Sequence, residues 1–430
     1  MFGASPYDLT FDLKFPMPVL TGLDVLVREG FAGLKGKAIG LLCNQASVTR
    51  DLQYGLDRLL PEHQAGNFKI QAIFGPQHGL FGHTQDNMIE WEGATDERTG
   101  LRVFSLYGER REPSPEMLDG IEEFVIDLQD IGARYYTFVW TMSLCMKACE
   151  PLGIPVTVLD RPNPIGGEQI EGTVLQPGFE SFVGQYSVPT RHAMTIGELA
   201  RYLQARYFPC LNLNVVEMEG WERGMYWEHT GLPWSMPSPN MPTVDTAVVY
   251  PGACLLEATN LSEGRGTTRP FEIFGAPYLD SWSFADALDS LRLPGCVFRP
   301  LPFEPTFNKH KGKLCGGVQL HVTSRALFEP VLTYVAVMQE AIRQSSLQDT
   351  SHLVKQDQFV ADSEEAELPG FAWRNPPYEY VHDRRPIDIL AGNDWLEPAI
   401  SNLRPIGEIR DRMKSECLAF QAENAALLAH

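Results

Sequence analysis

The stretch that decides the fold is FKIQAIFGPQHGLFG, residues 68–82. Residues 68–74 form an apolar run typical of a buried strand, and the Gly-Pro and His-Gly pairs that follow mark its end. Open α/β sheets build their sites just outside the carboxyl ends of their strands. The stretch therefore predicts a buried strand and, directly after it, a functional loop that contains Gln77 and His78.

Further short apolar runs alternate with helical patterns on both sides of this stretch. Residues 195–207 predict a helix, with Thr195 as its N-cap and Glu198 completing a capping box. Alternation of strands and helices is typical of an α/β fold, in which helices cover both faces of a parallel sheet. The other predicted strands are residues 37–43, 102–106, 124–128 and 154–159, and the other predicted helices are residues 52–60 and 136–149.

The second half of the chain has a different pattern. Residues 220–277 are rich in Gly, Pro, Ser and Thr and predict long polar loops, which are usually functional inside a compact domain. We place a domain boundary near Asp280, so the chain divides into residues 1–280 and a smaller α+β domain, residues 281–430. In the smaller domain we predict a helix at 284–291, a strand at 317–322, a helix at 328–343 and an acidic surface loop at 356–368.

Composition excludes several classes of partner. The 430 residues carry a net charge of −20, which repels phosphate backbones and anionic membranes, so we expect neither nucleic-acid nor membrane binding. No run of 18 apolar residues predicts a membrane span, and the first 18 residues lack the pattern of a secretory signal. The eight cysteines form no CxxC pair, and Cys145 and Cys149 fit core thiols better than a disulfide. We therefore expect a cytoplasmic protein.

Polar side chains follow the strand predicted at residues 124–128. They are Asp127, Asp130, Arg134 and Tyr136. Two interpretations have equal weight. In the first, Arg134 forms an ion pair with Asp127 or Asp130 that fixes the loop; in the second, these side chains bind sugar hydroxyl groups directly. Asp160, after the next strand, lies in a rigid Pro-rich turn, for which a structural role is favoured.

Further candidate binding residues lie in loops. Arg191 and His192 precede the capped helix, whose N-terminus favours anions. Arg265 can grip a carboxylate with two parallel hydrogen bonds. The remaining candidates are Glu171, Asn240, Glu263 and Thr267.

The sequence contains only weak signals for a bound metal ion or cofactor. His78, His83 and Asp86 could be taken as a metal set, but their spacing is not that of a known metal motif, so we expect no metal site. No GxGxxG follows a predicted strand, which gives a dinucleotide no direct support. We expect no cofactor.

Long motifs resemble one enzyme family over nearly the whole chain. They are SLYG (105–108), DLQDIGARYYT (127–137), LDRPNP (159–164), RHAMTIGELA (191–200), PSPNMP (237–242), SEGRGTTRPFE (262–272) and FNKHKGKLCGGVQLHV (307–322). In this order they resemble the exo-β-N-acetylmuramidases of glycoside hydrolase family 171. The resemblance implies a Rossmann-like catalytic domain with a smaller C-terminal domain. It also implies release of N-acetylmuramic acid from the non-reducing end of peptidoglycan fragments, as in cell-wall recycling. Muramic acid carries a lactyl carboxylate, for which Arg265 or Arg191 is the expected partner.

The chain departs from the family pattern at two positions. Gln77 stands where the family carries the Glu of Glu-His-Gly, its leading candidate for the essential carboxyl group, and Phe81 stands where an Arg is usual. An amide cannot act as a general acid or base. Residues 83–93 also differ and bring in Asp86, Glu90 and Glu92.

Three accounts of Gln77 remain open. Glu90, Glu92 or Glu171 supplies the proton instead, with His78 beside it. Alternatively, the chain hydrolyses a different sugar conjugate and Gln77 binds an N-acetyl or hydroxyl group. In the third account it is an amino-sugar-binding protein that has lost hydrolysis. Each account expects a small carbohydrate, a muropeptide or disaccharide fragment, as the partner.

Overall fold

The computed structural model describes residues 19–84, 90–347 and 370–427. Its larger sheet has seven strands in the order β3-β4-β2-β1-β5-β6-β9. Six of them run parallel, and the short edge strand β3 is antiparallel to its neighbour β4. The strands are β1 (Ala38–Cys43), β2 (Lys69–Gly75), β3 (Ala94–Thr95), β4 (Arg102–Ser105), β5 (Glu123–Asp127), β6 (Val156–Leu159) and β9 (Leu213–Val216). The predicted parallel α/β sheet is confirmed.

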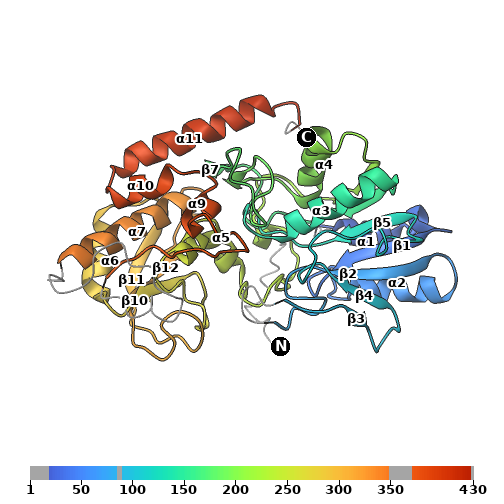
Figure 1. The fold of residues 1–430 in the computed structure, drawn as a ribbon, viewed down its shortest axis with the longest axis horizontal. Helices are drawn as coiled ribbons and strands as arrows, with labels where there is room; N and C mark the ends of the chain where they lie inside the picture. Colours follow the sequence, from blue (N-terminus) through green and yellow to red (C-terminus); the bar gives the residue numbers. More distant parts are fainter. Residues whose placement is uncertain (1–18, 85–89, 348–369, 428–430) are drawn as a thin grey trace, which may run out of the picture.

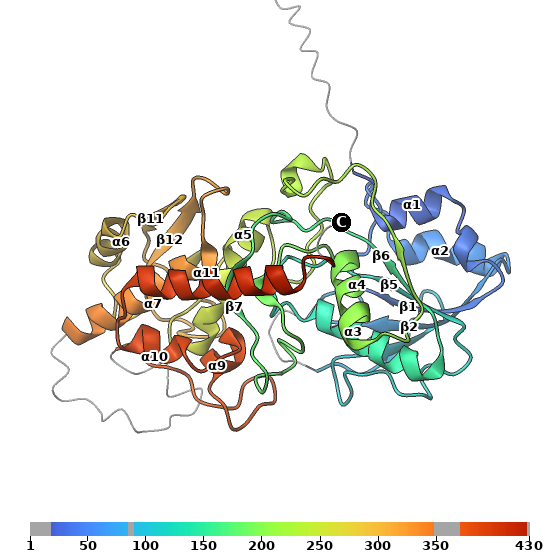
Figure 2. The ribbon, with the colours of Figure 1, turned by 90° about the horizontal axis from the view of Figure 1, so that it is seen from above.

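Helices cover both faces of this sheet (Figure 2). One face packs against α1 (Gly22–Arg28) and α2 (Gly55–Gln64), and the other packs against α3 (Phe138–Cys149) and α4 (Ile196–Tyr207). Alternate residues of a strand point to opposite faces, so Leu41 joins the core under α1 and α2 while Leu42 joins the core under α3. The capping box of α4 forms as predicted, with Thr195 accepting from the Glu198 amide and Glu198 accepting from the Thr195 amide.

The second lobe is built around a three-stranded antiparallel sheet in the order β10-β12-β11 (Figure 1). Its strands are β10 (Ile273–Ala276), β11 (Cys296–Pro300) and β12 (Gly316–Val322). Its helices are α5 (Val244–Ala253), α6 (Ser281–Ser290), α7 (Pro330–Leu347), α9 (Pro386–Ala391), α10 (Leu396–Ser401) and α11 (Ile406–Glu423). The strand and the two helices predicted beyond residue 280 correspond to β12, α6 and α7, and the acidic loop at 356–368 lies outside the described residues.

The prediction of long loops throughout residues 220–277 is wrong for part of that range. Helix α5 and strand β10 lie within it, and α5 is buried on all sides from Thr246 onward. A helix that is apolar all round has no amphipathic period to reveal it. Gly252 allows α5 to approach α7 closely, since a Cβ there would lie 2.0 Å from the Pro330 carbonyl oxygen. Because α5 and β10 pack with the second sheet, we propose a domain boundary before α5 rather than near Asp280.

The two lobes share one hydrophobic core, which runs from Leu42 in β1 to Phe420 in α11. Helix α11 extends from the second lobe toward α4, where Arg206 donates to the Asn424 side chain at 2.6 Å (Figure 2). Strand β7 (Glu171–Val174) pairs with β8 (Pro189–Arg191) and packs beneath α11. The lobes are therefore fixed relative to each other by packing.

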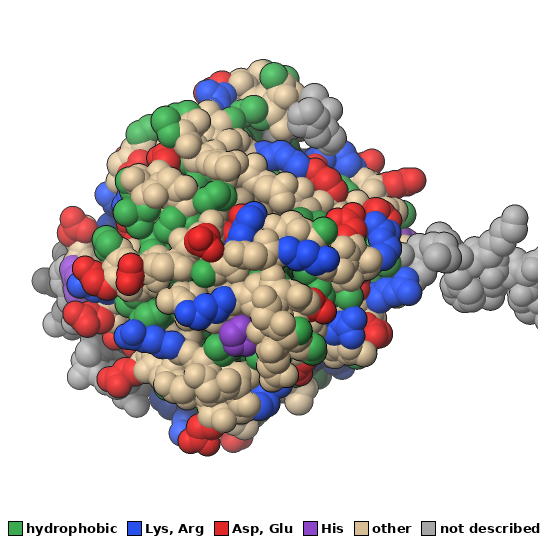
Figure 3. Space-filling model, turned by 90° about the vertical axis from the view of Figure 1, so that its right-hand side faces the viewer, with side chains coloured by type: hydrophobic (Ala, Val, Ile, Leu, Met, Phe, Trp, Pro, Cys, Tyr) green, Lys and Arg blue, Asp and Glu red, His purple; other side chains and the backbone are tan. Residues whose placement is uncertain are grey.

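The surface of the α/β lobe carries charges of both signs. On the face shown in Figure 3, acidic and basic side chains are interspersed rather than gathered into a patch of one sign. Within the described ranges, no helix is both long and apolar enough to cross a membrane.

Candidate functional site

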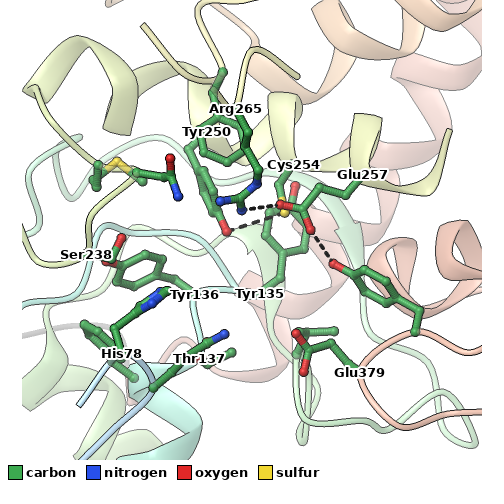
Figure 4. Close-up of a pocket in the computed structure, with 17 residues that line it drawn as sticks. His78, Tyr135, Tyr136, Thr137, Ser238, Tyr250, Cys254, Glu257, Arg265 and Glu379 are labelled. Carbon is green, nitrogen blue, oxygen red and sulfur yellow. Dashed lines mark hydrogen bonds and ion pairs between the residues drawn. The ribbon is translucent and has the colours of Figure 1, made fainter. Parts of the chain in front are cut away.

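A pocket of about 500 Å³, including its open mouth, lies between the two lobes (Figure 4). One wall comes from the end of β2 and the start of α3, and the opposite wall comes from α5, the turn after it and two loops of the second lobe. The side chains that line it are Gln77, His78, Tyr135, Tyr136, Thr137, Phe138, Val183, Ser238, Asn240, Met241, Tyr250, Cys254, Glu257, Arg265, Phe271, Tyr378 and Glu379.

The loop after β2 holds Gln77 and His78 in the pocket wall. His78 adopts a left-handed backbone conformation, with φ of 68°, which is strained for a residue other than glycine and is typical of functional sites. Its Nδ1 lies 2.9 Å from the Thr84 carbonyl oxygen, and the Thr137 hydroxyl donates to Oε1 of Gln77 at 2.7 Å. The predicted position of these two residues at a strand end is confirmed.

Aromatic rings form the apolar part of the wall. Tyr136 packs edge-on against Phe138 at 4.9 Å and against Tyr250 at 5.9 Å, and Tyr250 packs against Phe271 at 4.8 Å between ring centroids. Binding pockets commonly combine such rings with a few placed polar groups. A sugar ring, apolar on its faces and polar at its edge, fits this combination.

A buried ion network forms the opposite wall. Arg265 donates to Oε1 of Glu257 at 2.7 Å, and its Nε lies 3.2 Å from Glu263, which Lys309 also contacts at 2.9 Å. The Tyr378 hydroxyl donates to the other oxygen of Glu257 at 2.7 Å. Two buried carboxylates thus face two cations, which balances the charge. Figure 4 shows the part of this network at the pocket, where Arg265 and Tyr378 hold Glu257.

Glu379 is the second carboxyl group of the pocket. It lies in a tight turn in which Tyr378 and Val381 exchange backbone hydrogen bonds, with φ of 44° at Glu379 and 67° at Tyr380. Burial, reinforced by the nearby charge of Glu257, raises the pKa of Glu379 to about 7. The Tyr107 hydroxyl donates to it at 3.4 Å. A carboxyl group with a pKa of about 7 keeps its proton in about half of the molecules at neutral pH, and it can donate that proton to a bound ligand.

Five of the residues predicted from the sequence meet in this pocket. They are Gln77, His78, Tyr136, Asn240 and Arg265. Arg265 is committed to Glu257 and Glu263, so it is not available as the partner of a ligand carboxylate.

The ion pair predicted for Arg134 with Asp127 or Asp130 is wrong. Asp127 pairs instead with Arg161 through two hydrogen bonds of 2.5 and 2.9 Å. Asp130 lies 3.2 Å from Nε2 of His192. The Arg134 guanidinium is fully buried and donates to the carbonyl oxygens of four residues, Thr173, Val188, Leu390 and Ala391. None of these predicted binding residues lines the pocket; in the structure they hold loops together.

Asp160 and Arg191 also have structural surroundings. Asp160 accepts from the Gly197 amide at 2.8 Å and from the Thr195 hydroxyl at 3.0 Å, at the N-terminus of α4. Arg191 donates to the Ile165 carbonyl oxygen at 2.6 Å and to the side chain of Gln169. Both residues are buried outside the pocket, so neither is available to its ligand.

The remaining predicted acids lie outside the pocket lining. Glu90 is exposed and accepts from the Tyr380 hydroxyl at 2.8 Å, and Glu92 is exposed. Glu171 is half-buried beside α7, where it accepts from the Leu332 amide at 3.0 Å, and desolvation of its carboxyl group raises its pKa to about 8. Glu263 belongs to the buried ion network described above. The predicted ligand residue Thr267 donates to the Gly264 carbonyl oxygen and stabilises its own loop.

Sequence reasoning missed both carboxyl groups of the pocket. Glu257 follows the unrecognised helix α5, and Glu379 lies in the segment RNPPYEY, residues 374–380, where two prolines precede an acid between two tyrosines. The prolines and tyrosines around this acid were the sequence signal that could have identified Glu379 as a site residue. The strand-end rule directed attention to the first lobe only.

The switch point of the sheet has a smaller pocket. Strand order reverses between β1 and β5, where open α/β sheets commonly bind ligands. A pocket of about 290 Å³ lies there, lined by Ala46, Gln129 and Arg161 among others. No group of three His, Cys, Asp or Glu side chains suited to a metal ion occurs among the described residues, and Asp86 of the considered metal set lies outside them.

Comparisons with known proteins cover the whole described fold. A model of the N-terminal domain of the exo-beta-N-acetylmuramidase NamZ matches residues 39–245, and a model of its C-terminal domain matches residues 248–429. The peptidoglycan beta-N-acetylmuramidase NamZ of Bacillus subtilis is 43% identical over 408 residues, which are 94% of this chain and 90% of that protein.

Two crystal structures of DUF1343 family proteins from Bacteroides fragilis are similar in fold. One has a TM-score of 0.80 at 32% identity, and the other has a TM-score of 0.70 at 25% identity. In each case the match covers 96% of this chain and 98% of the other.

Proposed function

The chain belongs to the NamZ exo-β-N-acetylmuramidase family, and from that premise we propose that it is a glycoside hydrolase that releases N-acetylmuramic acid from the non-reducing end of peptidoglycan fragments. The Bacillus subtilis relative is named for this activity on peptidoglycan. The pocket between the lobes supports the proposal because its aromatic wall and buried carboxyl groups suit a sugar.

One observation carries the assignment of the acid: the buried carboxyl group of Glu379 lines the pocket, and its pKa is raised to about 7. We assign the proton donor to Glu379 rather than to Glu90, Glu92 or Glu171, none of which lines the pocket. The fixed charge of Glu257 helps to keep the proton on Glu379 in the absence of substrate. Pairs of carboxyl groups with different environments are typical of glycosidases.

The proposed reaction needs one protein acid, because an N-acetyl sugar can supply its own nucleophile. Glu379 donates its proton to the glycosidic oxygen while the bond from that oxygen to C1 breaks. The acetamido oxygen of the same sugar forms a bond to C1. Water then replaces that oxygen at C1 and returns a proton to the Glu379 carboxylate.

Gln77 has a binding role in this scheme. An amide transfers no proton at neutral pH, but it both donates and accepts hydrogen bonds. Thr137 holds Oε1 of Gln77 at 2.7 Å, which orients the amide in the pocket wall. We propose that Gln77 contacts the N-acetyl or a hydroxyl group of the bound sugar.

Eight free cysteines support action in a reducing compartment. Six of them are buried, among them Cys145 and Cys149 in α3. We propose a cytoplasmic role in the recycling of cell-wall fragments, since thiols persist there without forming disulfides.

Turnover of a defined disaccharide tests the proposed function. Purified chain is incubated with MurNAc-β-1,4-GlcNAc, and the products are separated by chromatography. Free MurNAc and GlcNAc are expected in equal amounts, whereas GlcNAc-β-1,4-MurNAc, with the other sugar at its non-reducing end, is expected to remain intact. Binding of MurNAc-GlcNAc without turnover would favour the second candidate, an amino-sugar-binding protein, for which the amide at position 77 is the motivating observation. Absence of binding would overturn both.

A further inference from the structure

Arg111 lies among three aromatic rings beside the pocket. The central carbon of its guanidinium is 3.9 Å from the ring centroid of Tyr380, 4.7 Å from that of Phe182 and 4.8 Å from that of Tyr107. Stacking of this kind holds a guanidinium in one orientation while leaving its edge open for hydrogen bonds. The aromatic rings therefore position the side chain, although Arg111 lies in the loop between β4 and β5.

Two of the three guanidinium nitrogens of Arg111 have no hydrogen-bond partner. Its Nε and Nη2 are buried and form no hydrogen bond, while the rest of the side chain interacts with Tyr107 and Tyr380 and its charge acts on Glu379. A buried donor that no acceptor satisfies is costly. By contrast, Arg265 donates to two buried carboxylates, and both terminal nitrogens of Arg191 donate to protein oxygens. Arg111 is thus a guanidinium beside the pocket with two adjacent donors that no protein acceptor satisfies.

The surroundings of Arg111 connect it directly to the proposed acid. Tyr107 stacks on Arg111 and donates to Glu379 at 3.4 Å, and Tyr380 directly follows Glu379 in the chain. Phe182 is adjacent to Val183, which lines the pocket. Tyr380 is 44% exposed, so this aromatic cluster reaches the protein surface, and its four residues lie outside the pocket lining.

We infer that Arg111 binds the carboxylate of the sugar held in the pocket, and so selects N-acetylmuramic acid over N-acetylglucosamine. The two sugars differ by the lactyl ether, whose carboxylate matches the two adjacent donors Nε and Nη2 of a guanidinium edge. The inference rests on the proposed function and replaces Arg265 and Arg191 as the expected carboxylate partners. It makes Arg111 a specificity-determining residue that does not itself carry the transferred proton.

The test compares Arg111→Gln with Arg110→Gln. Arg110 is exposed and adjacent in the chain, so the control removes the same charge from the same loop. The dissociation constants of free MurNAc and of free GlcNAc are measured by calorimetry, and kcat/KM is measured on aryl β-glycosides of both sugars. Thermal unfolding checks that each variant is folded.

Arg111→Gln is expected to weaken MurNAc binding by about tenfold to a hundredfold, the usual effect of losing a charged hydrogen-bond partner. The loss on MurNAc should exceed any loss on GlcNAc by about tenfold, and Arg111→Lys should recover part of it. Equal losses on both sugars, or no loss on MurNAc, would overturn the inference. Because binding is measured separately from turnover, a wild type that binds MurNAc selectively but hydrolyses nothing would contradict the proposed function and leave the role of Arg111 supported.

Discussion

Replacing Glu379 with Gln removes the proposed proton donor while keeping the size of the side chain. The Tyr107 hydroxyl, 3.4 Å from Oε2 of Glu379, can donate equally well to an amide oxygen. A positioned acid typically contributes about 10²–10⁴-fold to the rate. We therefore expect kcat on an aryl β-N-acetylmuraminide to fall by about 10²-fold or more, with a much smaller change in KM.

The same substitution should not destabilise the fold near neutral pH. A pKa raised from its usual value to about 7 corresponds to roughly 3 kcal/mol that disfavours the buried carboxylate. The folded state holds this proton more tightly than the unfolded chain, so its contribution to stability is present below the unfolded pKa and is lost as pH rises through about 7. Gln cannot ionise, so loss of activity through unfolding is not expected.

The assay is release of the aryl group as a function of pH, with Glu90→Gln as the matched control. Glu90 is an exposed acid that contacts Tyr380 of the same turn. Wild type and Glu90→Gln should lose kcat/KM as pH rises above about 7, where Glu379 loses its proton. A Glu379→Gln enzyme within about threefold of wild type, or a Glu90→Gln enzyme with the larger loss, would refute the assignment of the acid.

The remaining predictions concern Gln77, the ion network and Glu171. Gln77→Glu should leave turnover on the same aryl substrate unchanged or lower it, since Glu379 already supplies the proton; a rise of about 10²-fold would instead place the acid at position 77. Arg265→Met should cost about 3–5 kcal/mol in chemical denaturation, because Glu257 and Glu263 would remain buried without it; a loss below about 1 kcal/mol would contradict the network. Burial raises the pKa of Glu171 to about 8, so its contribution to stability is lost as pH rises from about 4.5 to 8. Glu171→Gln should flatten the dependence of Tm on pH in that range. An unchanged dependence would contradict the contribution of Glu171 to stability.

The centre of the larger sheet was predictable because its strands are apolar on both faces, whereas the exposed edge strand β3 and the half-exposed β9 were not predicted. The strands β1, β2, β5 and β6 appear in the sequence as short apolar runs between helical patterns, and the capping box of α4 is a local signal. Helix α5 was not predictable by periodicity, because it is buried all round and contains Pro251. Sequence patterns identify helices and strands that have one polar face, or whose ends carry capping or turn residues.

The site was predictable only on the side built by the first sheet. Gln77 and His78 follow from the rule that sites lie at strand ends. Glu257 and Glu379 come from segments far along the chain, and only tertiary packing brings them opposite Gln77. The partner of Asp127 was likewise decided by packing, since Arg161 reaches it from the end of the neighbouring strand.

A crystal structure of the chain with bound N-acetylmuramic acid tests the central claim most directly. Our account predicts the sugar in the pocket between the lobes, with its anomeric oxygen within hydrogen-bond distance, about 3 Å, of the Glu379 carboxyl group. The lactyl carboxylate should lie against Arg111. A sugar bound instead at the switch-point pocket beside Gln129 and Arg161, or bound between the lobes with no carboxyl group near its anomeric oxygen, would contradict the account.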